Sequence, residues 1–177
     1  DSPSFGGFSV ATSVGKQVLS TVADTIDSDI ALRYSHEGAH FKLEAQGSYI
    51  WVDRRAGGRN NRTAIASVSA EHKPSGLILS VSTGTRDIAG SYHYVKLSYD
   101  PVIPRIGPLS VSVDYYSGRD MVSVGSRSEA WGVGLIQSYE KLKLESYLGV
   151  RHYAYEDSSV FDYQNAVSVL LGARWRF

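Results

Sequence analysis

The chain contains no cysteine and only one methionine, and it carries no net charge. Without cysteine it has no disulfide framework, no thiolate metal site and no cysteine nucleophile. Its 18 basic and 18 acidic residues cancel, so no overall field attracts nucleic acid, which we exclude as an expected partner. Any electrostatic function must therefore come from local arrangements of charge.

Long apolar runs are also missing. No run approaches 18 residues and the mean hydropathy is −0.18, which excludes a transmembrane helix. A transmembrane β-barrel remains open, because its strands need only alternate apolar residues over about ten positions. The 12 tyrosines, 17 glycines and many serines favour strands with aromatic girdles over a helical core.

The dominant pattern is an alternation of apolar and polar residues with period two. In LSVSVDYY, one face carries Leu109, Val111, Val113 and Tyr115, and the other carries Ser110, Ser112, Asp114 and Tyr116. FKLEAQGSYIW and LKLESYLGVRHY repeat the scheme. This recurrence predicts an all-β, antiparallel fold. No domain boundary or long helix stands out, so we expect a single β-barrel domain over residues 1–177.

The pattern predicts about ten strands, joined by connections of alternating length. The predicted spans are 5–16, 28–35, 40–53, 62–72, 77–86, 92–100, 109–117, 128–139, 142–155 and 164–177. The short turns are HEGAH, KPSG and YEKL, with DPVIPRIGP a longer version; the loops are VLSTVADTID, RRAGGRNN, SGRDMVSVGSR and EDSSVF. Short periplasmic turns and longer external loops are typical of outer-membrane barrels. On this scheme both termini are periplasmic.

The alternation fits two opposite arrangements. A soluble sandwich or ligand carrier would turn its apolar face inward, and a membrane barrel would turn it outward. Aromatic side chains favour the second, because they gather on the apolar face near both strand ends, as at two membrane interfaces. The predicted girdle consists of Tyr34, Tyr99, Tyr139, Trp175 and Phe177 near the turns, with Tyr49, Trp51, Tyr115 and Trp131 near the loops.

The opposite face carries charges of both signs among serines and glycines. In a membrane barrel this face would line the lumen. We expect Arg174 and Arg176 of the last strand to lie near Lys143 and Glu145 of the preceding one. The predicted lumen-facing charges are Arg33, Lys42, Glu44, Glu71, Arg86, Lys96, Asp114, Lys143, Glu145, Arg151, Arg174 and Arg176.

The final strand, VSVLLGARWRF, alternates up to a terminal aromatic residue. It resembles the C-terminal strand of bacterial outer-membrane proteins, whose last phenylalanine is part of the signal read by the barrel-assembly machinery. By this resemblance Phe177 is the assembly signal.

Five segments in order resemble the C-terminal part of a Gram-negative general porin, roughly its last ten strands. They are DSPSFGGFSVATSVG, DIALRYSHEGAHFKLEAQGSY, SAEHKPSGL, SEAWGVGLIQ and SVLLGARWRF. The resemblance implies an outer-membrane trimer of sixteen-stranded barrels that passes small hydrophilic solutes. Such a porin is about twice as long, so we expect this chain to be an excerpt, with DSPSFGGF as a turn near the middle of the barrel. The alternative is a shortened relative in which residues 5–15 close against the last strand.

We therefore expect a passive pore with no enzymatic activity, catalytic residue, cofactor or metal. One alternative is a small closed barrel, filled by its charged side chains, with a structural or adhesive role. Another is an outer-membrane enzyme that modifies lipid. Ser146 and His152 would be its candidates, but they lie about 20 Å apart at strand spacing, too far for a nucleophile and its base.

Expected partners are outer-membrane lipids and lipopolysaccharide. The basic loop RRAGGRNNR suggests contacts to lipopolysaccharide phosphates, although it lacks the spacing of a phosphate-binding loop. Its arginines are Arg54, Arg55, Arg59 and Arg62. Asp24, Asp27 and Asp29 lack the spacing of a calcium loop. We assign a specific site to neither group.

Overall fold

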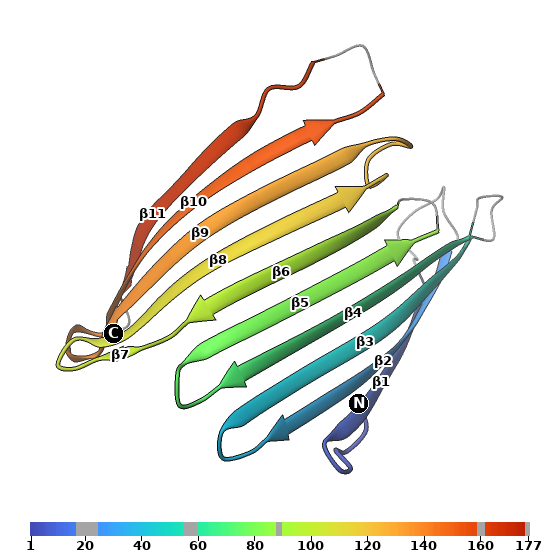
Figure 1. The fold of residues 1–177 in the computed structure, drawn as a ribbon. Helices are drawn as coiled ribbons and strands as arrows, with labels where there is room; N and C mark the ends of the chain where they lie inside the picture. Colours follow the sequence, from blue (N-terminus) through green and yellow to red (C-terminus); the bar gives the residue numbers. More distant parts are fainter. Residues whose placement is uncertain (17–24, 55–59, 88–89, 159–161, 176–177) are drawn as a thin grey trace.

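The computed structural model describes residues 1–16, 25–54, 60–87, 90–158 and 162–175. These residues form one antiparallel, 11-stranded sheet in which the long strands lie side by side in chain order (Figure 1). Strands joined by short connections usually pair with each other, so the order follows from the connections. No helix within the described ranges is long and apolar enough to span a membrane.

The ten predicted strands are confirmed, with changes at their ends. The strands are β1 (Phe8–Lys16), β2 (Thr25–Glu37), β3 (Phe41–Arg54), β4 (Asn61–His72), β5 (Leu77–Arg86), β6 (Ser91–Tyr99), β7 (Val102–Ile103), β8 (Gly107–Arg119), β9 (Arg127–Tyr139), β10 (Leu144–Glu156) and β11 (Ala166–Trp175). The additional β7 is a two-residue strand within DPVIPRIGP that pairs with β8. A single 3₁₀ turn, η1 (Glu140–Leu142), joins β9 to β10.

The segment DSPSFGGF contains the tight turn expected from its sequence. Phe5 and Phe8 exchange both backbone hydrogen bonds, at 2.8 and 2.9 Å. The loop between them has two residues, Gly6 and Gly7, with φ of 58° and 86°. Positive φ at both positions is the type I′ geometry that favours glycine in hairpins. Strand β1 therefore begins at Phe8, later than predicted, and the Ser2 N–H donates to a β1 carbonyl at 2.7 Å.

The two ends of the sheet differ as expected. The short turns at residues 38–40, 73–76 and 140–143 lie at one end (Figure 1). The loop at residues 120–126 lies at the other end, where the Asp120 carboxylate accepts a hydrogen bond from the Gly125 N–H at 2.6 Å. Residues 17–24, 55–59 and 159–161 of the other long connections lie outside the described residues.

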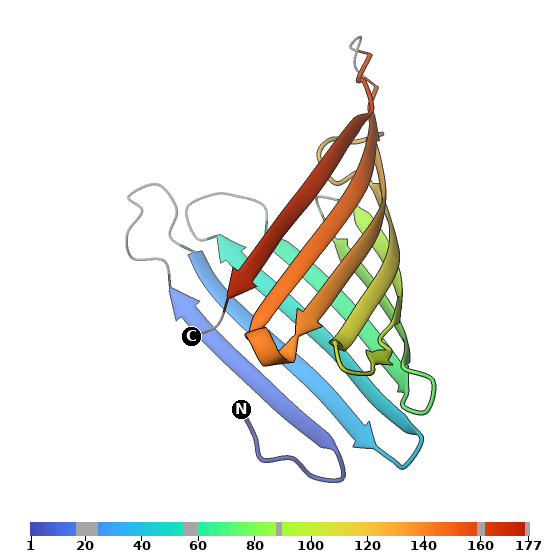
Figure 2. The ribbon, with the colours of Figure 1, turned by 90° about the vertical axis from the view of Figure 1, so that its left-hand side faces the viewer.

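The sheet curls without closing. Among the described residues β1 pairs only with β2, and β11 pairs only with β10. Figure 2 shows the resulting trough, with β1 and β11 as its two edges. The predicted antiparallel sheet is therefore confirmed, whereas the described residues do not close it into a barrel. The alternative in which residues 5–15 close against the last strand is wrong for the described residues, because no ladder joins these two edges.

The described part of the chain has almost no apolar core. Its only buried hydrophobic residues are Ala31 and Ala130. The accessible surface is 12602 Å², whereas a compact monomer of 19.4 kDa exposes about 8,500 Å². A globular domain normally buries one face of a sheet against a second layer. Here the sheet is a single layer, and both of its faces are open.

The apolar side chains are the exposed ones. Along β6, Val95, Leu97 and Tyr99 are exposed, whereas Lys96 between them is half-buried and Ser98 is buried. Curvature explains the difference, because side chains crowd together on the concave side of a sheet and spread apart on the convex side. The apolar face is therefore convex and uncovered, which is the reverse of what a soluble carrier requires.

Candidate functional site

The polar face is the face of the sheet that carries Ser80, Lys96, Asp114 and Arg151. Register connects these residues directly: Ser80 is opposite Lys96, Lys96 is opposite Asp114, and Asp114 and Arg151 are both opposite Gly132 of β9. Five strands therefore contribute to one row of side chains. The fixed alternation of a strand then assigns every second residue to the same face.

Ten of the twelve charged residues predicted to share a face lie on the polar face. They are Arg33, Lys42, Glu44, Glu71, Arg86, Lys96, Asp114, Glu145, Arg151 and Arg174. Lys143 is not part of a strand. This residue ends η1 in the left-handed conformation with φ of 49°, so it belongs to a turn and has no strand face. Arg176 lies outside the described residues.

One ion pair joins two strands, β8 and β10, that are separated by a third, β9. Arg151 Nη2 on β10 donates to Asp114 on β8, at 2.8 Å to Oδ1 and 2.9 Å to Oδ2. The strand between them contributes Gly132, where an added Cβ would lie 2.9 Å from Asp114 Oδ1. A side chain at position 132 would therefore push the carboxylate away. The missing side chain of glycine allows charges on next-nearest strands to meet.

Other charges on the polar face are paired within or between neighbouring strands. Arg174 Nη2 donates to Glu145 Oε1 at 2.7 Å, which confirms the predicted proximity of these two residues. Lys42 Nζ lies 2.9 Å from Glu44 Oε1. Lys96, by contrast, forms no ion pair with any described residue. It leaves a local excess of positive charge beside the Asp114–Arg151 pair.

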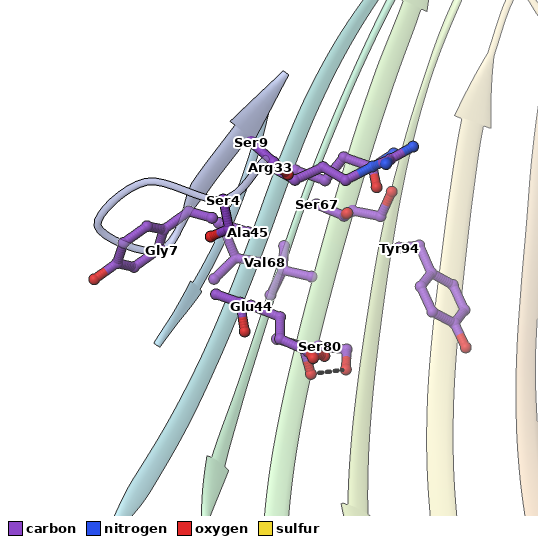
Figure 3. Close-up of a pocket in the computed structure, with 16 residues that line it drawn as sticks. Ser4, Gly7, Ser9, Arg33, Glu44, Ala45, Ser67, Val68, Ser80 and Tyr94 are labelled. Carbon is purple, nitrogen blue, oxygen red and sulfur yellow. Dashed lines mark hydrogen bonds between the residues drawn. The ribbon is translucent and has the colours of Figure 1, made fainter. Parts of the chain in front are cut away.

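Of the hollows that the described residues form on the polar face, two lie beside the charged and serine side chains of the candidate site. The larger one, of about 620 Å³, extends across β1 to β6 and is lined by Arg33, Glu44, Gln46 and a group of serines (Figure 3). The smaller one, of about 380 Å³, lies over β6 to β11 and contains Lys96 and the Asp114–Arg151 pair. Tyr94 borders both hollows. The polar side chains thus surround open space instead of filling it.

The sequence prediction did not include the tyrosines of the polar face among its site residues. Tyr92, Tyr94 and Tyr116 lie on it, and the rings of Tyr92 and Tyr116 are stacked with centroids 6.0 Å apart. Tyr153 continues the group on β10. Alternation assigned Tyr116 to this face, and it could have assigned Tyr92 and Tyr94 as well, because they lie four and two positions before Lys96. They were left out because aromatic residues were expected on the apolar face.

The apolar face is the opposite face, which carries Leu97, Val113, Val133 and Val150. These four residues are register partners on adjacent strands. Val113 is 50% exposed and Leu97 is 46% exposed. Large aliphatic side chains at such exposure, repeated over many strands, form an uncovered apolar surface of the kind that binds a membrane or another protein.

Aromatic side chains lie at both ends of the apolar face, at the predicted positions. The described members are Tyr34, Tyr99, Tyr139 and Trp175 near the turns, and Tyr49, Trp51, Tyr115 and Trp131 near the loops. Phe177 lies outside the described residues. The sequence prediction left out Phe8, which contacts the Tyr34 ring at 4.5 Å, and Phe41 beside His72.

The spacing of the two aromatic groups can be estimated on β9, which carries both Trp131 and Tyr139. A strand rises about 3.4 Å per residue, so residues 131–139 extend over roughly 27 Å. A tilt of about 40° reduces this length to roughly 20 Å, close to the ~25 Å apolar band of membrane barrels. The interval between the aromatic groups therefore suits a bilayer.

The other candidate groups do not come together as sites. His152 stacks on Trp131 at 5.6 Å, and Ser146 lies six positions earlier on the same strand. Asp29 accepts a hydrogen bond from Ser13. No cluster of three metal-ligating side chains occurs among the residues described. Asp24, Arg55 and Arg59 lie outside those residues, whereas Asp27 is in β2, Arg54 ends β3 and Arg62 is in β4.

No protein-family model matches this sequence, and comparisons with curated proteins and with solved structures found no significant match. Function must therefore be argued from the two faces of the sheet and the groups that they carry.

Proposed function

We propose that this chain forms part of the wall of an outer-membrane channel of the porin kind, which passes small hydrophilic solutes and ions by passive diffusion. In this proposal the apolar face contacts lipid and the polar face lines a water-filled lumen. No catalytic group and no cofactor is required. The dimensions of the lumen set the size limit, and the charges on the wall bias ion choice.

One observation carries the proposal: the apolar face is exposed, and the polar face surrounds the hollows. Val113 at 50% exposure lies between Asp114, which is paired inside the smaller hollow, and Ser112, which also lines it. A soluble protein with this arrangement would leave a broad apolar surface in water at a cost of about 25 cal/mol per Å². A lipid bilayer removes that cost, because its chains are themselves apolar.

Closure of the sheet is part of the proposal. Unpaired backbone groups are not tolerated in the hydrocarbon core, so β1 and β11 each require a further antiparallel partner strand in the membrane. The type I′ hairpin at Phe5–Phe8 directs residues 2–4 along the free edge of β1, where such a partner would lie. A complete barrel of about sixteen strands, assembled as a homotrimer, follows from the porin resemblance.

Orientation and partners follow from the same resemblance. The turn end, with both ends of the chain, would face the periplasm, and the loops would face the lipopolysaccharide. Phe177 would present the C-terminal signal to the barrel-assembly machinery. The lipid-modifying enzyme is a weaker alternative, because its candidate nucleophile Ser146 forms no hydrogen bond with a histidine among the described residues.

Planar-bilayer recording tests the proposal directly. The full chain, purified from membranes with every strand that belongs to its barrel, should produce discrete conductance steps in KCl. A heat-denatured sample of the same preparation serves as the control and should produce none. A current that stays at baseline with correctly folded protein would contradict the channel.

A further inference from the structure

One row of side chains on the polar face is free of charge over seven strands. Register connects Gln46, Ser67, Ser82, Tyr94 and Tyr116 on consecutive strands of the sheet, and continues through Ala130 to Tyr153 on β10. We call these six polar residues, from Gln46 to Tyr153, the uncharged row. Neighbouring strands are about 4.8 Å apart, so the row offers a hydrogen-bonding group at nearly every such step.

The serine part of the row has unused hydrogen-bonding capacity. Gln46 and Ser67 form no side-chain hydrogen bond with any described residue. Next to them, Ser69 and Ser80 share one hydrogen bond at 2.9 Å, which leaves acceptor positions on both oxygens. Each serine hydroxyl can donate once and accept twice, and the glutamine amide can do both. This mixture matches the hydroxyl groups of a sugar or polyol.

The charged groups at the border of the larger hollow are already paired. Arg33 Nη1 lies 3.3 Å from Asp1 Oδ1, and Glu44 is bound by Lys42. A charged solute would have to compete with these partners, whereas an uncharged solute would not. The larger hollow differs in this respect from the smaller one, which contains Lys96, a residue with no ion-pair partner in the described part of the chain.

Tyrosine rings continue the row beyond the serines. Tyr94 borders the larger hollow at β6, and Figure 3 shows it on the far side of the serine group from Gly7. Tyr116 and Tyr153 extend the series over β8 and β10. A tyrosine ring combines an apolar surface with a hydroxyl at its tip. Sugar rings have the complementary character, with C–H groups on their faces and hydroxyls around their edges.

We propose that the uncharged row is a binding track for neutral polyhydroxylated solutes, with short oligosaccharides as the chemical class. Serine and glutamine groups exchange hydrogen bonds with the solute hydroxyls, and the Tyr94 ring packs against a sugar face. The track lies on the wall of the proposed channel. Its role in the passage of solutes therefore rests on that proposal. It adds selectivity among neutral solutes to a pore that otherwise selects by size.

The test uses maltotriose as the probe and the full chain in its complete barrel. Isothermal titration calorimetry in detergent should give saturable binding to the wild type. Tyr94→Leu should weaken this binding about tenfold, as expected for the loss of one aromatic contact, and the double variant Ser67→Ala/Ser82→Ala should weaken it too. Tyr147→Leu is the matched control, because Tyr147 lies on the same face outside the row. It should bind like the wild type.

The outcomes separate the track from the channel. A conducting protein without saturable maltotriose binding would overturn the track and leave the channel standing. The track is also overturned if both row variants bind like the wild type, or if Tyr147→Leu weakens binding equally. A protein with a flat bilayer current that still binds maltotriose, with loss in the row variants, would contradict the channel and support the track. Folding of each variant is checked by circular dichroism and by heat-dependent gel mobility.

Discussion

Arg151 on β10 reaches over Gly132 on β9 and donates to both carboxylate oxygens of Asp114 on β8. The Asp114 side chain is 15% exposed and the Arg151 side chain 35% exposed. A part-buried pair of this kind is costly to break from one side, because the remaining charge loses its partner. The pair therefore fixes the local charge of the polar face.

Removal of Arg151 and removal of Asp114 should shift the ion selectivity of the channel in opposite directions. Arg151→Gln leaves Asp114 unpaired, so the channel should become more selective for cations. Asp114→Asn leaves Arg151 unpaired beside Lys96, so the channel should become more selective for anions. Reversal potentials in a KCl gradient measure both shifts. Arg105→Gln, in the turn before β8, is the control and should change nothing. Shifts of the same sign for the two variants would contradict the assignment of this pair to a lumen wall.

Lys96 and Lys143 should differ in their effect on the same measurement. Lys96 lies on the polar face without an ion-pair partner among the described residues, so Lys96→Gln should shift selectivity toward cations. Lys143 stands in the turn after η1, and Lys143→Gln should have little effect. An equal shift for both lysines would place Lys143 on the channel wall after all.

Glycines under tyrosine rings should be sensitive to small substitutions. A Cβ at Gly84 would lie 2.4 Å from Cε1 of Tyr92, so Gly84→Ala should destabilise the protein by about 1–3 kcal/mol. Gly47 has no neighbouring atom within 4 Å of such a Cβ, and Gly47→Ala is the matched control with little or no loss. Urea titration of both variants in lipid vesicles gives the difference in their free energies of unfolding. Equal stability would mean that the Tyr92 ring moves aside freely.

A charge in the middle of the apolar face should be costly only if that face meets lipid. Val113→Lys should destabilise the folded protein in phospholipid vesicles by about 2–4 kcal/mol. In the loop at residues 120–126, Val124 is 90% exposed, and Val124→Lys should be nearly neutral. Urea titration of the folded fraction measures both. If Val113→Lys is as neutral as the loop variant, the face is in contact with water and the membrane proposal fails.

The strands and their two faces could be predicted from the sequence because alternation acts within each strand. Side chains i and i+2 of a strand share a face whatever the rest of the chain does, so Lys96 and Asp114 could be assigned to the polar face in advance. The same rule failed at Lys143, where LKLE alternates correctly but a left-handed residue interrupts the strand. Local turn geometry, which alternation ignores, decides such positions.

The contacts of the candidate site depend on residues far apart in the chain. Asp114 and Arg151 are separated by 37 positions, and nothing in either strand indicates that the intervening partner is a glycine. The uncharged row has the same origin, since Gln46 and Tyr153 are brought into one line only by the registers of the strands between them. Alternation alone assigned Tyr116 to the polar face, whereas Tyr94 and Tyr153 were not assigned there because aromatic residues were expected on the apolar face.

The sequence by itself determined the strands, their antiparallel order and the membership of the two faces, because these follow from alternation and from short connections. Tertiary structure alone decided how far the sheet curves, that Arg151 meets Asp114 over Gly132, and that β1 and β11 are open edges among the described residues. Curvature, cross-strand contact and closure depend on how many strands combine. No single segment of the chain contains that information.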